Sequence, residues 1–154
     1  MFETDKLIYL QLQKTGCSHI AALLDRCFGG TQAKKHKPLA ETQTTKLIVG
    51  SVRNPWSWHV SLWAFGCLGR GGLSGRTTGR ARRNALEGRE AEAWREVYAD
   101  ANDPDRFRSW LGMVYDPQWR KKIGERFAKW GASESCGLLT YRYLKLHSRE
   151  FGRR

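Results

Sequence analysis

Residues 7–28, LIYLQLQKTGCSHIAALLDRCF, predict a strand, a tight loop and a helix in direct succession. The strand covers 6–13, which is rich in Leu, Ile and Tyr, and the helix covers 17–28 and ends at Gly29-Gly30. Five apolar side chains recur on one helix face: Ile20, Leu23, Leu24, Cys27 and Phe28. A glycine loop that opens a helix cradles phosphate, so we expect the unit to bind a phosphorylated nucleotide.

A second strand is predicted at 46–52, where KLIVGSV is nearly all apolar in its middle, as in a buried parallel strand. Arg53-Asn54-Pro55 ends it, and a helix follows from about Trp56 or Ser57 to Phe65. Two strands that each feed a helix imply a parallel sheet. We therefore expect an α/β fold, a P-loop-like three-layer domain with a small parallel sheet flanked by helices, as a single domain over 1–154.

The rest of the chain is less regular. Residues 66–92 are rich in Gly and Arg and predict a mobile loop or a segment that orders on binding. A helix is predicted at 103–115, with an Asp cap and Pro at its first position, and a short helix from Asp116-Pro117 to about 130. For 134–147 the pattern favours a helix but also allows a strand.

Charge and composition narrow the partners. Lys and Arg outnumber Asp and Glu by 27 to 15, a net charge of +12, which indicates a polyanion: nucleic acid or a nucleotide with several phosphates. The four cysteines form no C-x-x-C pair and no His stands at zinc-finger spacing, so we expect no metal. We expect no membrane span and no secretory signal, and hence a cytoplasmic protein.

Two motifs carry the candidate chemistry. The first is Q-K-T-G-C-S-H at 13–19, where Lys14 supplies a cation and the hydroxyls of Thr15 and Ser18 supply hydrogen bonds. The second is V-R-N-P-W at 52–56, followed by Ser61. Arg53 can grip a phosphate with its planar fork, and Ser61 can add a hydroxyl. Each motif alone is also compatible with an ordinary turn.

Together the two motifs resemble those of the sulfotransferase superfamily, whose members use 3′-phosphoadenosine 5′-phosphosulfate (PAPS). The runs QKTGCSHIAALL and RNPWSWHVSLW look like a bacterial branch of that family, and the resemblance is specific over 7–65. It implies that a loop binds the 5′-phosphosulfate: Lys14, Thr15, Gly16, Cys17 and Ser18. It also implies that Arg53 and Ser61 bind the 3′-phosphate. The chain lacks a late Gly-rich segment that many cytosolic members use, so we expect a short or truncated member.

An acceptor hydroxyl or amine needs a base, and His36 is our candidate, since its ordinary pKa suits proton transfer near neutrality. Its neighbours Lys34, Lys35 and Lys37 should lower that pKa. Glu41 is the second candidate. We interpret His19 as structural or a helper and His59 as structural. Three tryptophans flank His59, and we expect at least two in the core while a ligand-stacking role stays open: Trp56, Trp58 and Trp63.

The favoured function is a PAPS-dependent sulfotransferase, with Lys14 and His36 catalytic and the acceptor unidentified: a carbohydrate, lipid, peptide or small molecule. One alternative is an inactive module that holds a nucleotide without turnover. A less favoured alternative is an RNA-binding protein that uses the Arg-rich segment. The sequence does not predict the oligomeric state.

Overall fold

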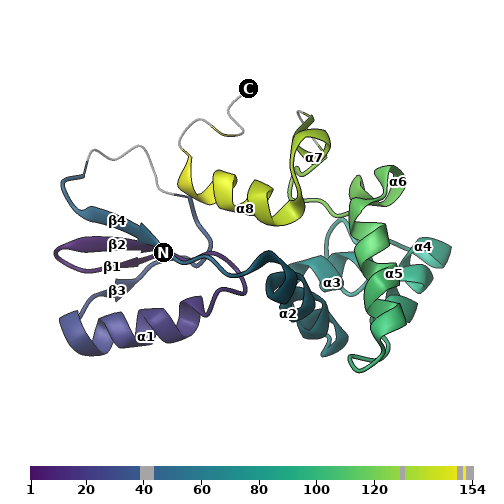
Figure 1. The fold of residues 1–154 in the computed structure, drawn as a ribbon, viewed down its shortest axis with the longest axis horizontal. Helices are drawn as coiled ribbons and strands as arrows, with labels where there is room; N and C mark the ends of the chain where they lie inside the picture. The colour runs from purple at the N-terminus through teal and green to yellow at the C-terminus, as the bar shows by residue number, and fades with distance from the viewer. Residues whose placement is uncertain (39–43, 129–130, 149–150, 152–154) are drawn as a thin grey trace. The chain divides into compact units, whose positions relative to one another are not determined.

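The computed structural model describes residues 1–38, 44–128, 131–148 and 151, and among them it has four strands and eight helices (Figure 1). The strands are β1 (Phe2–Glu3), β2 (Leu7–Leu10), β3 (Thr31–Gln32) and β4 (Leu47–Gly50). The helices are α1 (Cys17–Phe28), α2 (Pro55–Cys67), α3 (Gly72–Thr77), α4 (Gly88–Val97), α5 (Pro104–Tyr115), α6 (Pro117–Arg120), α7 (Ala132–Ser135) and α8 (Leu138–His147). The chain is thus a mixed α/β protein.

Two compact units make up the chain, where the sequence led us to expect one domain. The sheet unit consists of Met1–Asn54 and Leu139–Arg154, and the helical unit consists of Pro55–Leu138. All four strands, α1 and nearly all of α8 belong to the sheet unit, and α2 to α7 belong to the helical unit.

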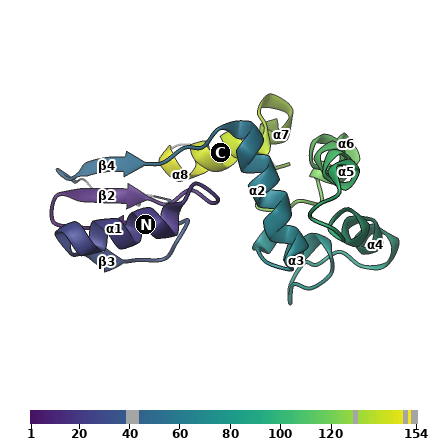
Figure 2. The same ribbon diagram turned by 60° about the horizontal axis from the view of Figure 1, so that its bottom comes forward.

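The sheet has the strand order β3-β1-β2-β4. Strands β2 and β4 run parallel, with Leu7 opposite Leu47 and Leu10 opposite Gly50, and Figure 2 shows them pointing the same way. The predicted parallel pairing of these two strands is confirmed. The sheet as a whole is mixed, because β1 pairs antiparallel with both β2 and β3.

Helices cover both faces of the sheet. Side chains alternate along β2, so each face of the sheet presents apolar groups to a helix. On one face Tyr9 packs with Phe2 and with Cys17 and Ala21 of α1. On the other face a second apolar cluster joins the sheet to α8, with these buried members: Ile8, Leu10, Leu12 and Leu146. Figure 1 shows α1 and α8 on opposite sides of the strands. The sheet unit therefore has three layers.

The prediction that the second strand is buried is wrong. Strand β4 lies at the edge of the described sheet, and its Leu47 and Ile48 are 65% and 41% exposed. The predicted apolar face of α1 is also shifted, since Leu23 and Phe28 are 46% and 67% exposed. Helical spacing groups side chains on a face correctly but does not decide which part of that face meets the sheet.

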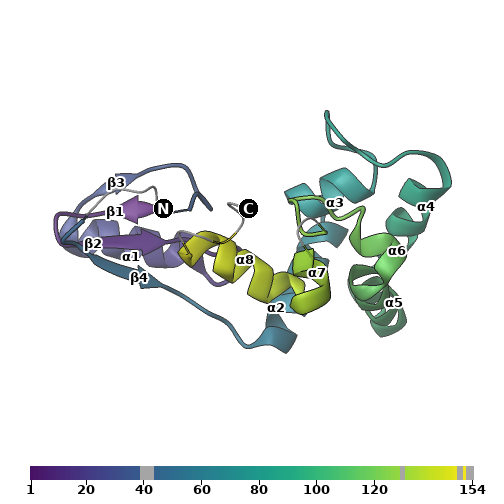
Figure 3. The same ribbon diagram turned by 90° about the horizontal axis from the view of Figure 1, so that it is seen from above.

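The helical unit is built around aromatic side chains. Trp58, Trp94 and Trp110 are fully buried, and the indole N–H of Trp110 donates to the Tyr98 hydroxyl at 2.8 Å. Helix α5 contacts α4 and α6, as Figure 3 shows. The predicted Asp cap of α5 is confirmed, since the Asp103 carboxylate accepts from the backbone N–H groups of Asp105 and Arg106.

Two predictions for the helical half need correction. Residues 66–92 are not a loop throughout, because α3 and the start of α4 lie there and Leu73 is buried. The helix predicted from 117 ends at Arg120, and residue 130 lies outside the described residues.

For 134–147 the favoured helix is confirmed over Leu138–His147. Of the described helices, none combines the length and apolar character that crossing a bilayer requires.

Candidate functional site

The loop between β2 and α1 places Lys14, Thr15 and Gly16 at the carboxyl end of a parallel strand. Gly16 caps α1 with a φ of 77°, and its carbonyl accepts the first helical hydrogen bonds from His19 and Ile20. Lys14 also has a positive φ, 62°, which is uncommon for a residue with a side chain. The open N-terminal turn of α1 offers backbone N–H groups and the positive end of the helix dipole.

The five loop residues differ in what their side chains offer. Lys14 and Thr15 are half-buried, and Gly16 and Ser18 are exposed. The Cys17 side chain is buried in the core beneath α1. Cys17 can therefore offer a ligand only its backbone N–H. The Ser18 hydroxyl accepts a hydrogen bond from Lys35 Nζ at 2.9 Å. Lys35 therefore places a second cation, besides Lys14, at the loop.

A chain of hydroxyl groups ties the loop to the segment after β4. Thr15 Oγ1 lies 2.9 Å from the Leu12 carbonyl and 2.8 Å from Ser51 Oγ, which lies 2.6 Å from the Tyr9 hydroxyl. A carbonyl only accepts, so Thr15 donates to Leu12, Ser51 donates to Thr15 and Tyr9 donates to Ser51. The Thr15 proton is thus used within the protein. No sequence motif pointed to Tyr9 or Ser51, because this hydrogen-bond chain joins residues that are distant in the sequence.

Arg53 brings the second motif to the first. Its Nη1 donates to the Lys14 carbonyl at 3.3 Å. Burial lowers the pKa of Lys14 from its ordinary value, and the positive charge of Arg53 lowers it further. Two like charges held in this way repel each other, and an oxyanion beside them would relieve the repulsion.

His36 lies beside the end of β2. Its Nδ1 is 2.6 Å from the carbonyl oxygen of Gln11, so Nδ1 carries the proton and donates, and the neutral ring keeps its basic lone pair on Nε2. The pKa of His36 is lowered, first by partial burial and then by positive charges that include Arg142 and Lys35. The predicted direction is confirmed, although burial is the larger cause. His36 also has a positive φ, 58°.

Three candidates remain: Ser61, Glu41 and His19. Ser61 is half-buried on α2 and belongs to the helical unit, whereas Arg53 belongs to the sheet unit. Glu41 lies outside the described residues. His19 is exposed on α1. No group of three His, Cys, Asp or Glu side chains suited to a metal ion occurs within the described ranges.

Comparison of the chain with protein-family models, with curated proteins and with solved structures finds no significant match.

The helical unit carries a mostly apolar pocket of about 240 Å³ beside α2. It is lined by Pro55, Trp56, His59, Leu111 and Tyr115. His59 Nδ1 donates to the Pro55 carbonyl at 2.7 Å, so its Nε2 accepts from the Tyr115 hydroxyl, also at 2.7 Å. The expected division of the tryptophans holds: Trp58 and Trp63 are buried, while Trp56 is 76% exposed at this pocket.

Proposed function

We propose that the protein is a PAPS-dependent sulfotransferase. One observation carries the proposal: the two cationic motifs meet at the carboxyl ends of the adjacent parallel strands β2 and β4, where Arg53 bonds to the Lys14 carbonyl. Ligands of open α/β sheets bind at the carboxyl ends of the strands. A nucleotide with phosphate groups would meet cations and a helix N-terminus there.

The residues of the loop fit a phosphosulfate. A Cβ on Gly16 would meet no atom within 4 Å, so the loop is open on that side of Gly16. The backbone N–H groups of that turn and the Lys14 ammonium would bind the oxygens of the 5′-phosphosulfate. Arg53 would bind the 3′-phosphate. A contact between the Ser61 hydroxyl and the same phosphate stays a prediction.

PAPS supplies a sulfuryl group whose bond to the 5′-phosphate oxygen breaks as a bond from sulfur to the acceptor oxygen or nitrogen forms. Lys14 would stabilise the negative charge that develops on the leaving phosphate oxygen. His36 would take the acceptor proton on Nε2, because Nδ1 is committed to the Gln11 carbonyl. The lowered pKa of His36 keeps that nitrogen unprotonated at neutral pH.

Calorimetric titration with the product nucleotide, adenosine 3′,5′-bisphosphate (PAP), tests the site. We expect saturable binding that weakens in Lys14→Ala and Arg53→Ala. Lys6→Ala is the matched control. It removes the same charge, but Lys6 is exposed at the opposite end of β2. Equal weakening in the control, or no binding by the wild type, would refute the site.

A second assay separates an enzyme from a nucleotide-binding module. Transfer of labelled sulfate from PAPS to a panel of carbohydrate, lipid, peptide and phenol acceptors is expected above the background rate, and Lys14→Ala should lower it by about 100-fold or more. Binding of PAP without any consumption of PAPS would favour the inactive module.

A further inference from the structure

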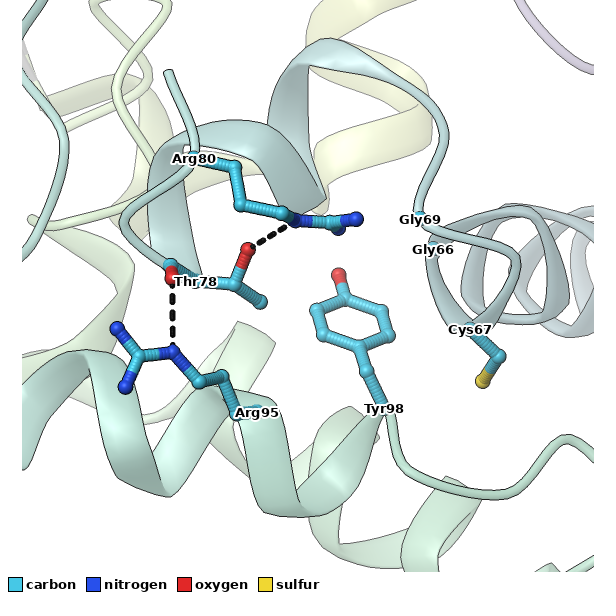
Figure 4. Close-up of a pocket in the computed structure, with 7 residues that line it drawn as sticks. All are labelled: Gly66, Cys67, Gly69, Thr78, Arg80, Arg95 and Tyr98. Atoms are coloured by element: carbon cyan, nitrogen blue, oxygen red, sulfur yellow. Dashed lines mark hydrogen bonds between the residues drawn. The ribbon is translucent and has the colours of Figure 1, made fainter. Parts of the chain in front are cut away.

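A second pocket of the helical unit has a different chemistry from the nucleotide loop. It measures about 230 Å³ and lies between the end of α2, the turn after α3 and helix α4 (Figure 4). Its lining residues are Gly66, Cys67, Gly69, Thr78, Arg80, Arg95 and Tyr98. All of them belong to the helical unit, whereas Lys14, His36 and Arg53 belong to the sheet unit and do not line the pocket.

Hydrogen bonds to neutral groups hold both arginines in place. Arg80 donates from Nε to Thr78 Oγ1 at 2.9 Å and from Nη2 to Ser74 Oγ at 3.2 Å. Arg95 donates from Nε to the Thr78 carbonyl at 3.0 Å, and Figure 4 shows the two guanidinium groups on either side of Thr78. Within the described part of the chain, neither is paired with a carboxylate. No carboxylate of the described residues therefore neutralises their positive charges.

Two glycines let the other walls approach closely. A Cβ on Gly69 would overlap Arg80 Nη1, and a Cβ on Gly66 would overlap the Tyr98 ring. Gly69 also has a φ of 71°, which residues with a side chain rarely adopt. The Tyr98 ring is buried and points its hydroxyl toward the Arg80 side of the pocket in Figure 4. The result is a cationic rim above an aromatic floor.

The lining residues that the structure describes include no acidic side chain. Burial raises the pKa of the Cys67 thiol, and the charge of Asp100 raises it further, so Cys67 is neutral at pH 7. Asp100 is exposed and does not line the pocket. The net charge of the lining is thus that of Arg80 and Arg95.

We propose that this pocket binds the oxyanion of a sulfate or phosphate monoester. Arginine forks match tetrahedral oxyanions, and guanidinium groups already held by hydrogen bonds lose less freedom on binding. The volume is below the roughly 300 Å³ at which ordinary small-molecule sites begin, which suits one ester group with a small organic part. The Tyr98 ring and the Gly66 backbone contact the organic part.

Two-dimensional NMR of the ¹⁵N-labelled full chain tests this proposal. Sodium sulfate, inorganic phosphate and phenyl phosphate are titrated at an ionic strength held constant with sodium chloride. We expect saturable shifts of the Arg80 and Arg95 side-chain Nε–H signals and of the Gly69 backbone N–H. We expect phenyl phosphate to bind more tightly than the inorganic ions, because its ring meets Tyr98.

Matched variants distinguish a site from general charge. Arg80→Gln should weaken binding by about tenfold, the equivalent of one charge-assisted hydrogen bond. Arg83→Gln removes the same charge from an exposed residue that does not line the pocket, and should leave the affinity unchanged. Arg80→Lys keeps the charge without the fork and should bind at an intermediate strength. The dispersion of the spectrum shows whether each variant is folded.

Linear shifts without saturation, or equal weakening in Arg80→Gln and Arg83→Gln, would overturn the proposal. Signals of the Lys14 loop report the nucleotide site separately in the same spectra. Lys14→Ala should leave the shifts of Arg80 and Gly69 unchanged. Loss of those shifts in Lys14→Ala would also overturn the proposal, because it would show that the anion does not bind the pocket independently of the nucleotide loop.

Discussion

Loss of the Ser51 hydroxyl should affect both the stability of the sheet unit and the geometry of its loop, and the two effects can be measured separately. Its hydroxyl accepts from Tyr9 and donates to Thr15, so Ser51→Ala removes two hydrogen bonds at once. A net 0.5–1.5 kcal/mol for each bond gives a loss of about 1–3 kcal/mol. Because Tyr9 is only 2% exposed, water cannot readily replace the lost partner, and we expect the upper half of that range.

Urea unfolding followed by circular dichroism measures this loss, and PAP titration measures its effect on the loop. We expect weaker PAP binding in Ser51→Ala, because Thr15 loses the bond that holds the loop against the segment after β4. Tyr9→Phe should cost less, since Ser51 can still bond to Thr15. The double variant should cost less than the sum, because the two residues share one bond.

Ser109→Ala is the control, because Ser109 is exposed on α5 and no described hydrogen bond involves its side chain. A Ser51→Ala variant whose free energy of unfolding lies within about 0.5 kcal/mol of the wild type, the range of ordinary surface changes, would contradict the expected loss. A fall in stability with unchanged PAP affinity would contradict the role of Ser51 in holding the loop.

Further predictions concern the proposed chemistry. Lys14→Ala should lower kcat by about 100-fold or more in a sulfate-transfer assay, because in the proposed mechanism Lys14 stabilises the leaving oxygen. Arg53→Ala should mainly raise KM for PAPS and discriminate poorly against adenosine 5′-phosphosulfate, which lacks the 3′-phosphate; undiminished preference for PAPS would remove the 3′-phosphate assignment. His36→Ala should lower turnover by about 100- to 10,000-fold with PAP affinity unchanged, while His19→Ala keeps full activity. Because the pKa of His36 in the folded protein is depressed below its ordinary 6.5, its contribution to stability is present above pH 6.5 and is lost as the pH falls toward the folded value. Thermal unfolding at pH 7.5 and 5.5 should therefore show a smaller acid destabilisation in His36→Gln than in the wild type.

The elements predicted best are those that short-range interactions specify. Helix α1 begins at Cys17 and ends at Phe28 as predicted, because the glycines on either side stop it in both directions. The Asp103-Pro104 start of α5 is equally local, since one carboxylate satisfies the first backbone N–H groups. The parallel pairing of β2 with β4 followed from two strand–helix units in succession.

The elements predicted worst depend on what packs against them. An apolar LIVG strand is typical of a buried position, but β4 lies at the edge of the described sheet. The Gly/Arg content of 66–92 indicated a loop, but α3 forms there with Leu73 and Thr77 buried in the helical unit. Composition records the average character of a segment and not the few side chains that anchor it.

The sequence by itself determined the tight loop at Lys14 to Gly16 and the Arg53 turn, because glycine, proline and helix caps act over a few residues. Only the tertiary structure decided that Ser51 bonds to Thr15, that Gln11 orients the His36 ring, and that Arg53 reaches the Lys14 carbonyl. Each of these contacts joins residues 25 or more positions apart. Such pairs form when the sheet and its flanking helices bring distant segments together, and no local pattern encodes them.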